Sequence, residues 1–144
     1  MTATSVRYDL ERFLLAQAGV HERAEAELRA GEKRSHWMWF VFPQIRGLGS
    51  SEMAARYALS SLDEARAYLH HPVLGPRLRE ITRIVLEVQG RSAEEIFGYP
   101  DDLKFHSCMT LFCRAAHSGE DHLFREALDR YFGGKEDEGT LQRI

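Results

Sequence analysis

The longest uninterrupted apolar run in the chain extends from Trp37 to Pro43 and contains both of its tryptophans. An aromatic side chain buries about 150–250 Å², so this run is expected to anchor a hydrophobic core. In a run this short, the pattern alone does not distinguish a buried strand from a buried helix of two turns. Because the neighbouring segments have helical periodicity and a lone strand would have no partner, we predict a short buried helix that Ser35 caps and Pro43 ends.

Helical spacing of apolar residues recurs through most of the remaining chain. Helices are predicted over residues 9–17, 20–30, 51–59, 61–71, 75–90, 92–98, 99–116 and 121–132. The start signals are clearest at Ser61 and Ser92, because a glutamate follows each serine at the spacing of a capping box. No segment alternates with a period of two, and no Asn-Gly or Asp-Gly hairpin occurs. The pattern therefore predicts an all-α fold.

The domain organisation is expected to be simple. A length of 144 residues fits one domain, and no linker, internal repeat or low-complexity segment divides it. We expect residues 1–144 to form a single compact multi-helix domain around the short buried aromatic helix. Its core is expected to span residues 8–133. Residues 134–144 are rich in charge, and we expect them to form a loose tail, although Leu141 and Ile144 could dock on the domain.

Composition and charge narrow the classes of partner. The chain is 44% hydrophobic and 28% charged, as is ordinary for a soluble globular protein, and its net charge of −3 does not favour nucleic-acid binding through a basic face. No signal-peptide pattern opens the chain, and no apolar run approaches the roughly 18 residues of a membrane span. Cys108 and Cys113 lie in an apolar run, as buried thiols of a reducing compartment do. The sequence predicts a cytoplasmic protein with no nucleic-acid or membrane partner, and it does not indicate an oligomeric state.

The start of the aromatic run offers a first candidate site. If a helix begins at His36, its free amides and the cations of Lys33 and Arg34 would converge on one spot and stabilise an anion there. Trp37 or Trp39 would then present a flat ring to a base or a sugar. The alternative is that both tryptophans belong to the core and the cations are solvated, which is the commoner arrangement for large aromatic residues.

A glycine-rich turn, residues 46–51, follows the aromatic run and offers a second candidate site. Glycines such as Gly49 allow close backbone approach to a phosphate, and Ser50 lies where the next helix begins. Gln44 and Arg46 at its start add polar groups. The turn lacks the preceding strand and the third glycine of a dinucleotide fingerprint, so an ordinary connection between helices is the commoner explanation.

A polar stripe on the predicted helix 99–116 is the third candidate. Lys104, Ser107 and Thr110 share one face, and Asp102 stands near the helix start. Serine and threonine compete for backbone hydrogen bonds inside a helix, so their presence there calls for a reason. The stripe is interpreted equally well as a wet surface.

Candidate catalytic groups are few. His36 or Asp102 could serve as a general acid or base, whereas His106 and Cys108 would point about 200° apart on a helix and cannot meet. The seven histidines show no His-Glu-x-x-His pattern and the cysteines no Cys-x-x-Cys spacing. We predict no metal site and no cofactor.

The segments Ser35–Gln44 and Gly47–Ser50 resemble the signature of domain-of-unknown-function family 1810, which includes a mycobacterial conserved hypothetical protein and whose members are sometimes labelled calpastatin-like. Further matching positions are Tyr57-Ala58, Glu64-Ala65, Tyr68-Leu69, Asp102-Leu103-Lys104, Ser107 and Met109-Thr110-Leu111-Phe112. The resemblance covers almost the whole chain and implies a small, mainly α-helical cytoplasmic domain with no established activity. Calpastatin-like inhibitor repeats are disordered, so that label does not suit this composition. Cys108 departs from the serine of the family pattern, which further argues against a role for its thiol.

These observations favour binding of a small anionic ligand, such as a nucleotide or an ADP-ribose derivative. The predicted ligand-binding residues are Lys33, His36, Trp37, Gln44, Arg46, Gly49, Ser50, Lys104 and Ser107. One alternative is a hydrolase or glycosidase acting on such a ligand with His36 or Asp102, and another is a protein-interaction domain without a small-molecule site. The pocket requires that the cationic and glycine-bearing ends of the aromatic run face one concavity.

Overall fold

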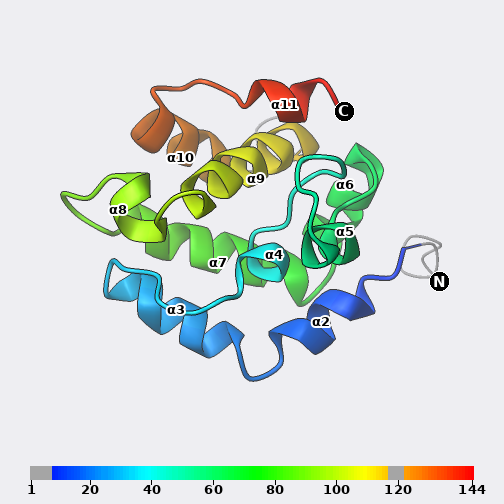
Figure 1. The fold of residues 1–144 in the computed structure, drawn as a ribbon, viewed down its shortest axis with the longest axis horizontal. Coiled ribbons are helices and arrows are strands. Elements are labelled where there is room, and N and C mark those ends of the chain that lie inside the picture. The colour runs from blue at the N-terminus through cyan, green and yellow to red at the C-terminus, as the bar shows by residue number, and fades with distance from the viewer. Residues whose placement is uncertain (1–7, 117–121) are drawn as a thin grey trace.

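The computed structural model describes residues 8–116 and 122–144, and within these ranges the chain is all-α (Figure 1). Ten helices lie in these ranges: α2 Glu11–Gln17, α3 His21–Arg29, α4 Met38–Val41, α5 Glu52–Tyr57, α6 Leu62–His70, α7 Leu74–Leu86, α8 Ala93–Phe97, α9 Asp101–Ala115, α10 Leu123–Phe132 and α11 Glu138–Leu141. They pack into one compact domain. The described residues contain no strand, only an isolated parallel bridge between Ile45 and Leu59. The predicted fold class is confirmed.

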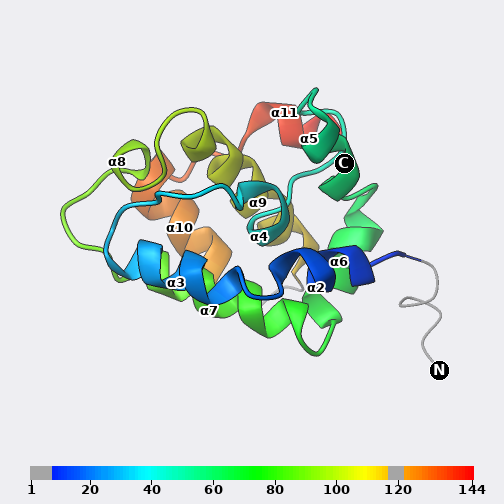
Figure 2. The same cartoon turned by 60° about the horizontal axis from the view of Figure 1, so that its bottom comes forward.

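Helix α4 lies in the middle of the molecule in both views (Figures 1 and 2). Trp37 and Phe42, which flank it, are fully buried. The ring of Phe42 packs edge-on against Phe97 and Phe105, with centroids 5.7 and 5.2 Å away. The segment is therefore a buried helix, as predicted, but of four residues instead of two full turns. The Ser35 hydroxyl donates to the Glu27 carboxylate and does not cap the helix, which begins at Met38.

The long helices α7 and α9 carry the packing around α4. Helices α6, α8, α10 and α11 all contact α9, whereas α3, α6 and α10 contact α7. The predicted apolar stripe of α7 is buried at Leu78, Ile81 and Val85, and Phe105 and Phe112 of α9 are fully buried. The buried residues of α7 follow the stripe that a period of 3.6 residues predicts, whereas in α9 every residue from Ser107 to Phe112 is buried, so α9 is enclosed on all sides over this stretch.

The two predicted capping boxes differ in outcome. At Ser92 both halves form, because the serine side chain accepts from the Glu95 amide and the glutamate accepts from the Ser92 amide. Ser61 likewise accepts from the Glu64 amide at 3.1 Å. The Glu64 carboxylate, however, accepts from the amide and hydroxyl of Ser60 and pairs with Arg12. The bond from the Glu64 carboxylate back to the Ser61 amide, which completes a capping box, is therefore not formed, because this carboxylate binds Ser60 and Arg12 instead.

The C-terminal segment differs from the loose tail that we expected. The Asp137 amide donates to the Thr110 hydroxyl at 2.9 Å, and the Ser107 hydroxyl donates to the Asp137 carboxylate at 3.2 Å. Thr140 is fully buried. The polar stripe of α9 thus provides hydrogen-bonding partners for the tail, and hydropathy alone did not reveal this docking. No helix among the described residues is long and apolar enough to cross a bilayer.

Candidate functional site

A cleft of about 190 Å³ opens beside α4, at the end of the aromatic segment where the glycine turn begins. Its lining residues come from α4 and its C-terminal flank, the following turn, α5 and α9: Met38, Trp39, Phe42, Gln44, Ile45, Arg46, Gly47, Gly49, Ala54, Ala55, Tyr57, Ala58 and Lys104. The apolar members of this set form most of the lining, and they include the aromatic residues Trp39, Phe42 and Tyr57. The cleft is therefore apolar in its interior with a few polar groups around it, as small-molecule sites usually are.

Two side chains of the cleft carry polar groups without a partner. Among residues 8–116 and 122–144, neither Gln44 nor Arg46 makes a side-chain hydrogen bond or ion pair, and Arg46 is exposed. Lys104 adds a second cation, because its Nζ lies 5.3 Å from the ring centroid of Trp39. An amide and two cations thus surround an apolar floor, an arrangement that suits a planar group bearing negative charge.

The orientation of these polar groups follows from an extended stretch of backbone. The Arg46 amide donates to the Leu59 carbonyl at 2.8 Å, and the Leu59 amide donates to the Gln44 carbonyl at 2.9 Å. Successive side chains alternate in extended backbone, and Ile45 is buried in the core. Gln44 and Arg46 therefore point away from the core while their backbone is held in place.

Close packing explains one glycine of the turn. A Cβ atom at Gly49 would lie 2.6 Å from the Cβ of Ala54, a distance that real structures do not show. The turn can therefore approach α5 this closely only with glycine at position 49. Ser51 then caps α5 by accepting from the Ala54 amide at 3.0 Å. Together these contacts bring the turn and α5 into the same wall.

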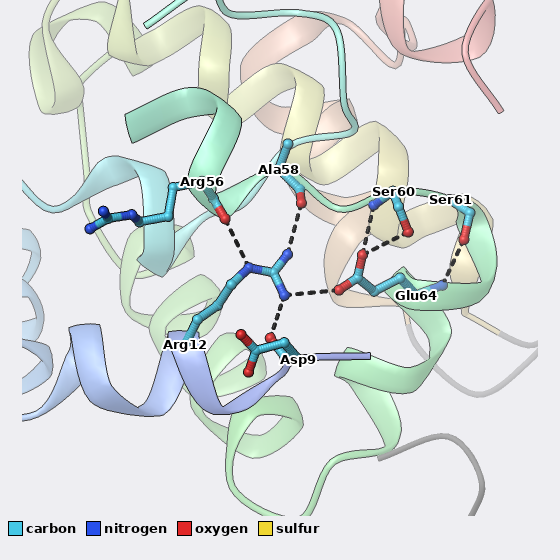
Figure 3. Close-up of polar contacts among 7 residues, drawn as sticks. All are labelled: Asp9, Arg12, Arg56, Ala58, Ser60, Ser61 and Glu64. Carbon is cyan, nitrogen blue, oxygen red and sulfur yellow. Dashed lines mark hydrogen bonds and ion pairs between the residues drawn. The ribbon is translucent and has the colours of Figure 1, made fainter. Parts of the chain in front are cut away.

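The C-terminal end of α5 forms one wall of the cleft, and hydrogen bonds from Arg12 of α2 hold this end in place (Figure 3). Its guanidinium donates to the carbonyls of Arg56 and Ala58 at 2.9 and 2.8 Å, and it also contacts the Asp9 carbonyl. The same group pairs with the Glu64 carboxylate at 3.1 Å, and the Glu64 side chain is only 4% exposed. Arg12 thus ties α2, the end of α5 and the start of α6 together. The cleft wall is held by charge-assisted hydrogen bonds that no ligand has to organise.

The other end of the aromatic segment is closed by the Glu27 carboxylate of α3. It accepts from the Trp37 indole at 2.9 Å, from the amides of Arg34 and Ser35, and from the Ser35 hydroxyl. Burial alone would raise the pKa of Glu27, but these hydrogen bonds outweigh it and lower the pKa from 4.5 to about 2. Trp37 is fully buried, and its indole N–H, the only polar group of the side chain, is hydrogen-bonded. Trp37 therefore belongs to the core and does not present its ring to a ligand.

Lys33 is also bound internally. Its Nζ donates to the Ser35 carbonyl at 2.6 Å and lies 2.8 Å from the Asp101 carboxylate, and its side chain is 7% exposed. The other oxygen of Asp101 lies 3.4 Å from Lys104 Nζ. Asp101 therefore bridges the two lysines, and Lys33 reaches the cleft only through this carboxylate.

Of the predicted ligand-binding residues, the structure brings four to the cleft: Gln44, Arg46, Gly49 and Lys104. It does not bring the other five there. Lys33 and Trp37 are engaged internally, His36 and Ser50 are exposed outside the cleft, and Ser107 donates to the Leu103 carbonyl and the Asp137 carboxylate. Asp102 lies near the start of α9 outside the cleft. The two ends of the aromatic segment therefore do not share one concavity.

Sequence reasoning missed the contribution of α5. Tyr57 and Ala58 line the cleft together with Ala54 and Ala55. The signal that could have found them is the Tyr57-Ala58 pair, which belongs to the family resemblance, together with two small alanines directly after a glycine turn. Among the described residues no group of three or more histidine, cysteine, aspartate or glutamate side chains could hold a metal ion.

The fold and the cleft define a small all-α domain in which a central aromatic helix borders a cationic, partly apolar cleft. The chain belongs to the family described as "Protein of unknown function (DUF1810)", which matches residues 7–144. It is similar to the conserved hypothetical protein Rv1873 from Mycobacterium tuberculosis, whose crystal structure shares 58% sequence identity over 96% of this chain and 97% of that chain, with a TM-score of 0.93. No curated protein matches the sequence.

Proposed function

We propose that the cleft binds a small anionic ligand with a planar ring, such as a nucleoside monophosphate. The observation that carries this proposal is that Gln44 and Arg46, whose side chains have no partner among the described residues, line the same cleft as Trp39. Lys104 supplies further positive charge at the same place. A base would stack in the apolar part of the cleft, and its phosphate would accept charge-assisted hydrogen bonds from the cations.

The size of the cleft favours one end of the predicted ligand range. A volume of about 190 Å³ lies below the roughly 300–1,000 Å³ that is usual for sites holding drug-sized molecules. The smaller end of the predicted ligand range, a nucleoside monophosphate with one base, one ribose and one phosphate, suits this space better than a dinucleotide. An ADP-ribose derivative would leave its second half outside the cleft, so we expect it to gain little over the corresponding monophosphate.

The lining supports binding over hydrolysis. A general acid or base must lie about 2.6–3.2 Å from the atom that it protonates or deprotonates, or one water molecule away. Among the residues that the structure describes, the side chains that line the cleft include no carboxylate, imidazole or thiol, and neither His36 nor Asp102 is one of them. We therefore place ligand binding ahead of the hydrolase or glycosidase alternative.

A thermal-shift screen tests the proposal. The panel contains nucleoside monophosphates, NAD, ADP-ribose, ribose 5-phosphate and inorganic phosphate. A ligand at a hundred times its dissociation constant adds about 2.7 kcal/mol to the free energy of unfolding, which raises the melting temperature measurably. We expect nucleoside monophosphates to raise it and inorganic phosphate alone to raise it less.

Calorimetric titration of the best compound then locates its site. Arg46→Ala is expected to raise the dissociation constant roughly 10- to 100-fold, because a hydrogen bond to a charged group is worth about 1.5–3 kcal/mol. Arg23→Ala removes the same charge from an exposed position of α3 and should leave the affinity unchanged. A panel without any stabilising compound, or equal affinities of the two variants, would contradict the proposal.

A further inference from the structure

The C-terminal segment Glu136–Ile144, here called the strap, packs directly on residues 46–50, here called the glycine loop. A Cβ atom at Gly47 would lie 2.8 Å from Nε of Arg143 in the strap. A Cβ atom at Gly139 of the strap would lie 3.0 Å from Cδ2 of Leu48. The two segments thus contact each other at a glycine on each side, Gly47 in the loop and Gly139 in the strap. A side chain at either glycine would require the opposite segment to shift. Figure 1 shows α11 beside this loop and above α9.

Asp137 holds the strap on α9 through its carboxylate and its backbone amide. Its carboxylate accepts from the Thr140 amide and hydroxyl at 3.0 and 2.7 Å, and from the Ser107 hydroxyl at 3.2 Å. Its amide donates to Thr110. Glu136 adds a two-pronged ion pair with Arg114, at 2.5 and 3.0 Å. These contacts dock the strap through polar groups, so its position depends on a few identifiable side chains.

The glycine loop has few anchors of its own. Within the described part of the chain, residues 46–50 make no side-chain hydrogen bond or ion pair. Their backbone is held at one end by the pairing of Arg46 with Leu59, and α5 begins at the other end behind the Ser51 cap. Between these points Gly47 adopts a φ of +98°, which glycine accepts freely. The strap covers Gly47 and contacts Leu48, whereas α5 packs against Gly49.

The same loop forms one edge of the cleft, because Arg46, Gly47 and Gly49 line it. We propose that the docked strap sets the conformation of the glycine loop and thereby the ligand affinity of the cleft, with Asp137 as the positioning residue. The part of this inference that concerns affinity rests on the proposed function. The part that concerns the loop does not, because the loop can be observed without a ligand.

Backbone order parameters from ¹⁵N relaxation test the coupling in the ligand-free protein. The amides of Gly47 and Gly49 report on the loop, and those of α7 report on the fold. In Asp137→Ala we expect the order parameters of both glycines to fall from about 0.85 to below about 0.6, with the α7 values unchanged. Glu138→Ala removes the same charge from the neighbouring residue but keeps the Asp137 contacts, and Asp137→Asn keeps an accepting oxygen. Both should leave the loop ordered.

Arg143→Ala provides a second variant that leaves Asp137 and its hydrogen bonds intact. It removes the side chain that covers Gly47, so we expect lower order at Gly47 with the strap still docked. This variant keeps the inference testable if Asp137→Ala fails to fold. Unchanged order at both glycines in Asp137→Ala, or unchanged order at Gly47 in Arg143→Ala, would overturn the coupling.

Titration of the same variants with AMP tests the effect on affinity. We expect Asp137→Ala to raise the dissociation constant roughly tenfold or more, because a loop that must be ordered on binding costs affinity. Asp137→Asn should keep the dissociation constant close to that of the unaltered protein. A looser loop with unchanged affinity would overturn the regulatory part of the inference. If the loop loosens but AMP and the rest of the panel do not bind even the unaltered protein, the proposed function fails while the coupling of strap and loop stands.

Discussion

The two ends of the aromatic segment Trp37–Phe42 both carry cationic and polar groups, but at one end these groups are bound inside the protein and at the other they line the cleft. Before it, Lys33 pairs with Asp101, and Glu27 accepts hydrogen bonds from the backbone at residues 34–35, the Ser35 hydroxyl and the Trp37 indole. After it, Gln44 and Arg46 reach the cleft with no partner in the part of the chain that the structure describes. We call these the closed end and the open end.

The difference lies in which carboxylates reach each end. Glu27 arrives from α3 and Asp101 from the start of α9, and both turn toward the closed end. At the open end, the Glu64 carboxylate of α6 pairs with Arg12 of α2 and not with Arg46 at the cleft. Lys33 is thus structural, because Asp101 pairs with it inside the protein, whereas Arg46 has no carboxylate partner among the described residues and is available for a ligand. Four predictions test this contrast.

The largest effect is expected at the closed end. Trp37→Ala should lower the free energy of unfolding by about 3–5 kcal/mol, because it leaves a cavity in the core and removes the indole hydrogen bond to the Glu27 carboxylate. Trp39→Ala should cost clearly less, since Trp39 is only partly buried at the cleft. Urea denaturation of both variants measures the difference. Equal losses would remove the distinction between the two ends.

The support behind the open end should be nearly as sensitive. Glu64→Gln is expected to lower the free energy of unfolding by about 3 kcal/mol, because breaking a buried pair leaves the Arg12 charge uncompensated. Asp63→Asn is the matched control: its pair with Arg66 is exposed and should be worth less than about 1 kcal/mol. If both variants unfold at the same urea concentration, the Arg12–Glu64 pair does not hold the wall.

A pH titration of stability should identify Glu27. Because its pKa is lowered from 4.5 to about 2 in the folded protein, its stabilising contribution is complete above pH 4.5 and is lost as the pH falls toward 2. At pH 7, Glu27→Gln should cost about 1.5–3 kcal/mol through weaker hydrogen bonds. The difference between the two proteins should shrink on going from pH 5 to pH 3, and other carboxylates cancel in this comparison. A difference that is constant with pH would show that the Glu27 charge is not what closes this end.

The smallest effect is expected at the open end itself. Gln44→Ala and Arg46→Ala should each change the free energy of unfolding by no more than about 0.5 kcal/mol, because neither side chain has a partner to lose. The same urea denaturation measures this. A loss above about 1 kcal/mol would show that these side chains have a structural role, and would weaken the case for a ligand.

The helical fold could be predicted because its signals are local. Apolar spacing identified α7 and α9, and serine caps marked α5, α6 and α8. The single turn α4 was predicted from its surroundings, but its length was not, since the partner of Ser35 is Glu27 on another helix. The hydrogen bonds that dock the tail were not predicted either, because their partner, Asp137, lies far away in sequence from Ser107 and Thr110, which suited solvent equally well.

The candidate site divides in the same way. Gln44, Arg46 and Gly49 were predicted from one short segment, and they do come together in the cleft. Their role toward a ligand remains a prediction. Lys33 and Trp37 have the same local appearance, and only tertiary partners on α3 and α9 separate them from the cleft. Patterns along the chain find polar and aromatic groups, whereas the completion of those groups by distant carboxylates is decided by the fold.

The indole N–H signals of the two tryptophans test the contrast between the ends most directly. In ¹H–¹⁵N spectra of the unaltered protein, assigned with Trp39→Phe, AMP should shift the Trp39 signal saturably. The Trp37 signal should stay in place because its N–H is already donated to Glu27. A stabilising ligand that moves the Trp37 signal and leaves that of Trp39 unchanged, or that moves neither, would contradict the account.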